Sequence, residues 1–91
     1  MRYIYTAWLR DDSLPEDDPE FEWPACFLIS GRSAESAREW GDHLAKRYSA
    51  ARGLVVARSS VVAETDSALP GVAGLPVVEE GSDATDDEIG W

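Results

Sequence analysis

The sequence predicts an α+β fold in which one helix lies across a small antiparallel sheet, in the order strand, strand, helix, strand. Three observations support it. Residues 2–10 and 25–30 are short β-prone stretches, residues 33–53 place apolar or small side chains at helical spacing, and residues 54–64 are again rich in valine. We expect residues 1–80 to form one domain, because a sheet with a helix on one face buries a single core.

The first expected strand, Arg2–Arg10, is rich in aromatic and β-branched residues and carries bulk on both faces. Odd-numbered residues from Tyr3 to Leu9 share one face, and even-numbered residues from Ile4 to Trp8 share the other. Bulk on both sides fits a central strand with one face under the helix and the other half covered. The alternative is that one aromatic face stays exposed and marks a contact surface.

Residues 11–24, DDSLPEDDPEFEWP, contain seven acidic residues and three prolines. Because prolines interrupt regular elements, we expect a long acidic loop here. The alternation of residues 20–23 leaves open an earlier start of the second strand. The loop lacks the glycine and the ligand spacing of an EF-hand, so we expect neither a metal nor another cofactor.

This acidic segment has two interpretations. In one it is a solvated connection whose Phe21 and Trp23 tuck back into the core. In the other it is a recognition loop, because aromatic anchors commonly dominate binding energy and long loops are often functional. The residues that would bind a partner are Asp17, Asp18, Glu20, Phe21, Glu22 and Trp23.

The next stretch, Ala25–Ser30, is a continuous apolar run that predicts a buried strand. Cys26 within it fits a small buried hydrophobe better than a nucleophile. The helix of residues 33–53 has both of its ends marked. Ser33 is a good N-cap, and Gly53 can adopt the positive φ that commonly ends a helix. The apolar or small stripe consists of Ala37, Trp40, Gly41, Leu44, Ala45, Tyr48 and Ala51.

Residues 54–64 form the third expected strand, with a bulge or a break at Ser59–Ser60. Residues 75–79 could add a fourth strand at an edge, where a proline is tolerated. Residues 81–91 are acidic and carry little bulk, which predicts a disordered tail. The alternatives for this tail are a linear binding motif around Trp91 or a Trp91 that folds back onto the sheet.

The net charge of −10 is unevenly distributed along the chain. Residues 1–24 carry −5, residues 25–63 carry +3 and residues 64–91 carry −8. A surface this acidic repels nucleic acid, so we expect no nucleic-acid partner despite the basic residues in the middle of the chain. The acidic flanks could instead close back onto the Lys46–Arg47 end of the helix.

The sequence contains no spaced set of catalytic residues, and we expect a non-enzymatic protein. Its N-terminus lacks the apolar region of a signal peptide, and no apolar run is long enough to span a membrane. Its one cysteine excludes an intramolecular disulfide. We therefore expect a cytoplasmic protein without a membrane partner.

The leading hypothesis is a small acidic protein-interaction module that engages the basic surface of another protein, as inhibitors, immunity proteins and nucleic-acid mimics do. Its acidic loop and tail would steer the partner, and Phe21, Trp23 or Trp91 would anchor it. The alternative is a structural domain that forms a homodimer through an exposed aromatic sheet face at Tyr3, Tyr5 or Trp8.

Overall fold

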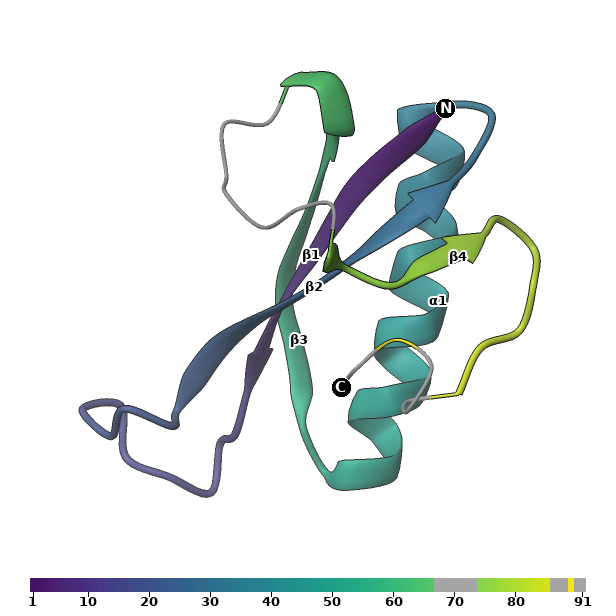
Figure 1. The fold of residues 1–91 in the computed structure, drawn as a ribbon. Helices are drawn as coiled ribbons and strands as arrows, with labels where there is room; N and C mark the ends of the chain where they lie inside the picture. The colour runs from purple at the N-terminus through teal and green to yellow at the C-terminus, as the bar shows by residue number, and fades with distance from the viewer. Residues whose placement is uncertain (67–73, 86–88, 90–91) are drawn as a thin grey trace.

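The structure is a computed structural model and describes residues 1–66, 74–85 and 89. In this part of the chain, an α-helix lies across one face of a four-stranded sheet (Figure 1). The α+β class and the helix packed on one sheet face are confirmed. In chain order the elements are β1 (Arg2–Arg10), β2 (Glu22–Ser30), α1 (Ala34–Arg52), β3 (Val55–Ala63), a 3-10 helix (Glu64–Asp66) and β4 (Val77–Glu79).

The strands lie in the order β3-β1-β2-β4, so β1 is central. β1 pairs antiparallel with β2 and β3, whereas β4 pairs parallel with β2 over Leu28–Ser30. The fourth strand anticipated at residues 75–79 is present, but its parallel pairing makes the sheet mixed rather than wholly antiparallel. The physical reason is the connection of residues 64–76, because a connection of this length lets the next strand run parallel, whereas a tight turn does not.

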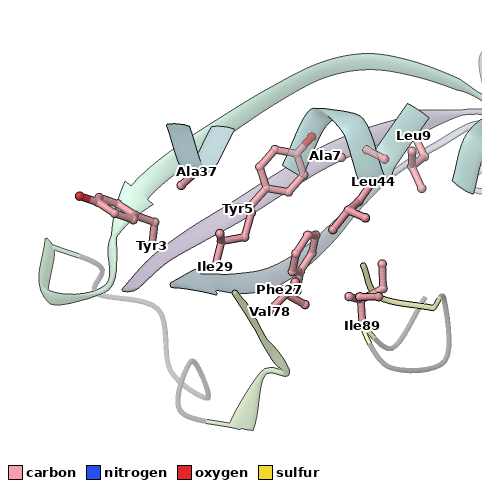
Figure 2. Packing of buried hydrophobic residues seen from close by; sticks show 12 residues of the cluster. Tyr3, Tyr5, Ala7, Leu9, Phe27, Ile29, Ala37, Leu44, Val78 and Ile89 are labelled. Carbon is pink, nitrogen blue, oxygen red and sulfur yellow. The ribbon is translucent and has the colours of Figure 1, made fainter. Parts of the chain in front are cut away.

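The core lies between α1 and the face of the sheet formed by the odd-numbered residues of β1. Tyr5 and Phe27 are paired neighbours on β1 and β2, and both are fully buried with ring centroids 5.4 Å apart. Figure 2 shows these rings beside Leu44 of α1. The proposed exposure of Tyr3 and Tyr5 is therefore wrong, because both lie in this core and only Trp8 is on the opposite face.

Both predicted ends of the helix are confirmed. The Ser33 hydroxyl accepts a hydrogen bond from the Ser36 N–H at 3.1 Å, and the Ser36 hydroxyl accepts one from the Ser33 N–H at 3.2 Å. These bonds satisfy two donors that the first turn of a helix would otherwise leave unpaired. Gly53 ends the helix with φ +69°, a conformation that side chains other than glycine adopt at a cost.

Gly41 is the point of closest approach between the helix and the sheet. A Cβ built on Gly41 would overlap ring atoms of Tyr5, so the glycine lets the helix lie directly on the ring. At the next residue of the helix, the Asp42 carboxylate accepts a 2.7 Å hydrogen bond from the Tyr5 hydroxyl. Burial, reinforced by this carboxylate, raises the pKa of Tyr5, so its hydroxyl stays protonated and remains a donor.

β3 is one continuous strand with an irregularity near its start. The register with β1 shifts between Trp8 and Leu9, which face Arg58 and Val56 respectively. The bulge that was anticipated at Ser59–Ser60 therefore falls at Ala57. The extra residue returns Val56 to the core side, where it packs against the buried cluster, while Arg58 stays on the far face with Trp8.

The C-terminal strap, which we define as residues 80–85 together with Ile89, packs beside α1. Its Ala84 and Ile89 are only 4% and 2% exposed and belong to the core cluster. The Arg47 guanidinium donates to the Asp83 carboxylate and to the Ala84 carbonyl. These contacts agree with the predicted alternative in which an acidic flank closes onto the Lys46–Arg47 end of the helix. Within the expected tail of residues 81–91 the structure thus describes residues 81–85 and Ile89, and Trp91 lies outside the described residues.

Acidification is expected to weaken the strap through Asp83. Hydrogen bonding and charge from Arg47 hold the pKa of the Asp83 carboxyl below its usual 3.8. The stability from this pair is therefore complete above the pKa of the unfolded chain and is lost as the pH falls through the lower pKa of the folded state. Thermal melts by circular dichroism between about pH 5 and pH 2 should show a smaller loss of Tm for Asp83→Asn than for the wild type.

The matched control is Asp17→Asn, which removes one carboxylate from an exposed position in the β1–β2 connection, far along the chain from Arg47. Its melts should follow the wild-type pH profile. A profile for Asp83→Asn that runs parallel to the wild type would contradict the coupling between Asp83 and Arg47.

Candidate functional site

The acidic loop, which we define as residues 11–21, connects β1 to β2. Figure 1 shows it projecting from the end of the hairpin, away from α1. The loop is shorter than the predicted range of 11–24, because β2 begins at Glu22 and includes Pro24, as the alternative of an earlier strand start within residues 20–23 anticipated. A proline fits there because β4 pairs with β2 only at residues 28–30, so β2 has an open edge at Pro24 that needs no N–H donor.

Backbone hydrogen bonds close the acidic loop and divide it into turns. The Asp11 N–H donates to the Phe21 carbonyl at 2.8 Å, which joins the two ends of the loop. Inside it, the Leu14 N–H donates to the Asp11 carbonyl at 3.1 Å, and the Phe21 N–H donates to the Asp18 carbonyl at 3.0 Å. The loop therefore presents its side chains from a defined backbone rather than from a freely moving chain.

Two of the loop carboxylates support this backbone. Asp11 Oδ1 accepts from the Ser13 N–H at 3.0 Å and from the Ser13 hydroxyl at 2.6 Å, while Asp18 Oδ1 accepts from the Glu20 N–H at 2.8 Å. Such bonds are typical of aspartates that stabilise turns. Asp18, predicted as a partner-binding residue, thus has a local structural role.

The remaining loop carboxylates meet solvent. Glu16, Asp17 and Glu20 are exposed. Arg10, at the end of β1, forms a 2.6 Å ion pair with Asp12, whose hydrogen bond and charge raise the pKa of Arg10. The charge of Arg10 is therefore offset mainly by Asp12, and Glu16, Asp17 and Glu20 give the surface of the loop a negative electrostatic potential.

A shallow hollow of about 340 Å³ combines the charged and aromatic parts of this site. Glu20 and Trp23, both predicted partner-binding residues, lie on it together. Trp23 also packs against the core, so its indole joins the site to the folded domain. The full lining is Asp11, Leu14, Pro19, Glu20 and Trp23.

The other predicted site residues are not brought to this hollow. Asp17 is exposed outside it, and Phe21 is half-buried. Glu22 is paired with Arg10 in the sheet, on the face opposite Trp23. Sequence reasoning missed Leu14 and Pro19, for which the one available signal was their position within the acidic segment.

No group of three or more His, Cys, Asp or Glu side chains is placed to hold a metal ion in the part of the chain that the structure describes. The His43 ring stacks on Trp40 with centroids 4.9 Å apart, and Cys26 lies 3.3 Å from the Thr6 hydroxyl. Among the described residues, no helix is both long and apolar enough to cross a membrane.

No protein-family model, curated protein or solved structure matches this chain. Any statement about function therefore rests on the residues of the site itself. Among the described surfaces, the acidic loop combines exposed charge, an aromatic wall and a defined backbone.

Proposed function

We propose that this protein is a non-enzymatic interaction module whose acidic loop binds the basic surface of another protein. The observation that carries the proposal is the defined loop backbone, closed by the Asp11–Phe21 hydrogen bond. A loop that is ordered before binding loses less conformational entropy on association than a flexible one. The exposed carboxylates are thus held in a fixed pattern at the projecting end of the molecule.

The two parts of the site have different tasks. Glu16, Asp17 and Glu20 supply the long-range attraction that raises the association rate with a cationic surface. Trp23, Leu14 and Pro19 supply apolar area that becomes buried only when the surfaces touch. A bound Lys or Arg side chain can lie with its methylene groups on this apolar area and its charge towards Glu20.

A titration with a peptide rich in lysine and arginine tests the proposal. The largest NMR shift changes in ¹⁵N-labelled protein should fall on residues 11–23. The triple variant Glu16→Gln, Asp17→Asn, Glu20→Gln should bind the peptide roughly tenfold more weakly at low salt, because three steering charges are lost. The salt dependence of its binding should be correspondingly flatter.

The matched control, Glu35→Gln, Glu39→Gln, Glu79→Gln, removes the same charge from exposed positions on α1 and β4. It should retain most of the affinity. Equal weakening by both triple variants would mean that diffuse net charge, rather than the acidic loop, attracts the peptide, and would overturn the proposal.

A further inference from the structure

The face of the sheet opposite α1, here called the open face, carries exposed apolar side chains at positions where polar side chains are usual. An antiparallel sheet with one solvated face usually alternates apolar and polar side chains. Here Val62 and Val77, both on this side, are 45% and 47% exposed. A largely apolar hollow of about 510 Å³ lies on the face, lined by Ile4, Thr6, Trp8, Pro24, Cys26, Ser60 and Val62.

The charges on the open face differ from those on the molecule as a whole. Arg2 and Arg10 of β1 lie on this side, and the Arg58 guanidinium stands 4.5 Å from the centre of the Trp8 ring. The acidic groups are Glu22, opposite Arg10, Glu64, which pairs with Arg2 at 2.7 Å, and Glu79, opposite Ser30 on β4. These three basic and three acidic residues cancel, whereas the whole chain carries −10.

We propose that the open face pairs with the open face of a second copy of this chain. The chain's excess of acid would hinder self-association through most surfaces, but this face carries almost no net charge. Both signs are present at its margins, so a two-fold arrangement can set an arginine of one copy against a glutamate of the other. A basic partner fits less well, because it would meet Arg2, Arg10 and Arg58.

The geometry also disfavours a small-molecule occupant. Pro24, Ser60 and Val62 on the rim are exposed, so a small molecule would remain partly in water, whereas bound ligands are usually mostly enclosed. Ile4 and Leu28 on this face are already buried at 4% and 1% exposure, so a dimer would cover less new apolar surface than the roughly 800 Å² that each partner buries in a standard interface. The dimer is therefore weak, and we expect half-dimerisation at a concentration on the order of 100 µM.

Sedimentation velocity over a concentration series of the full chain tests the proposal. The wild type should shift from monomer to dimer, and Val62→Asp should remain monomeric at about 1 mM, because an aspartate would be trapped between two apolar faces. Cys26, the one cysteine of the chain, gives a second readout, because its maleimide labelling should slow as the dimer forms. A wild type that stays monomeric at about 1 mM overturns the proposal.

The control Ala50→Asp adds the same charge at an exposed position on α1 and should dimerise like the wild type. If Val62→Asp fails to fold by circular dichroism, Ser60→Glu takes its place, because Ser60 is exposed and polar already. A Val62→Asp variant that folds and still dimerises overturns the proposal. So does a monomeric wild type that binds the apolar dye ANS at the hollow and loses this binding in Val62→Asp.

Salt distinguishes this proposal from the proposed function. Screening should strengthen the dimer, because it reduces the repulsion between two chains of charge −10. The same salt should weaken the binding of a cationic peptide to the acidic loop. Failure of either surface therefore leaves the result for the other unchanged.

Discussion

Gly41→Ala is expected to destabilise the fold by about 3 kcal/mol, because the added methyl group would overlap the Tyr5 ring. Neither side of this contact can move easily. The ring is fully buried beside Phe27, and its hydroxyl is held by Asp42. The helix must therefore lift from β1 or Tyr5 must leave its rotamer. Alanine's better helix propensity, worth up to about 1 kcal/mol, offsets only part of this cost.

Urea unfolding followed by circular dichroism measures this free energy. The control is Gly74→Ala, since a Cβ at Gly74 meets open space and should change the stability little. A double-mutant cycle with Tyr5→Leu gives a sharper check. A smaller side chain should relieve the overlap, so Gly41→Ala should cost clearly less in the Tyr5→Leu background. An equal cost in both backgrounds would place the strain elsewhere.

Ile89→Ala is expected to lower the free energy of unfolding by about 2–4 kcal/mol. The side chain is 2% exposed and belongs to the same cluster as Phe27, Leu44 and Val78, as Figure 2 shows. Removing three carbon atoms loses their burial and leaves a cavity that a packed core fills only in part. Chemical unfolding measures the change, with the midpoint concentration as the robust quantity.

Val77→Ala is the matched control for Ile89→Ala. Val77 is also an aliphatic residue of the C-terminal third, but it is 47% exposed on the open face, so its truncation should cost well under 1 kcal/mol. If Ile89→Ala were as mild as Val77→Ala, Ile89 would contribute little to the core. Provided that they remain folded, Ile89→Ala and Val77→Ala should both bind the cationic peptide with the affinity of the wild type.

The helix was the most predictable element, because its signals are local. Ser33 and Gly53 mark its ends through backbone conformation alone, and the small residue at position 41 anticipates a close approach to the sheet. The faces of β1 were harder. Both faces carry bulky side chains, and only the position of α1 determines that Tyr3 and Tyr5 lie beneath it.

The strap illustrates a different limit. Ile89 stands among acidic residues, and composition alone therefore favours disorder. Its burial depends on a space beside α1 and β2 and on Arg47, thirty-six positions from Asp83 in the chain. The parallel pairing of β4 depends likewise on a contact between segments far apart in the chain, Leu28–Ser30 and Val77–Glu79. Neither is encoded in a local pattern.

The candidate site was predictable in part. Glu20 and Trp23 were identified from charge and aromatic character, and they do meet on one hollow. Leu14 and Pro19 join them only because the hydrogen bond from Asp11 to Phe21 closes the loop. Asp18 carries the same charge as its neighbours in the sequence, and only its bond to the Glu20 N–H reveals a local role.

The strand order implies an uneven resistance to local opening. β1 has a paired strand on each edge and α1 above it, so its amide groups should exchange with solvent only when the whole domain unfolds. β4 pairs through three residues along one edge, and the strap follows it directly. Opening should therefore begin at β4 and the strap, while the hairpin that carries the acidic loop remains closed.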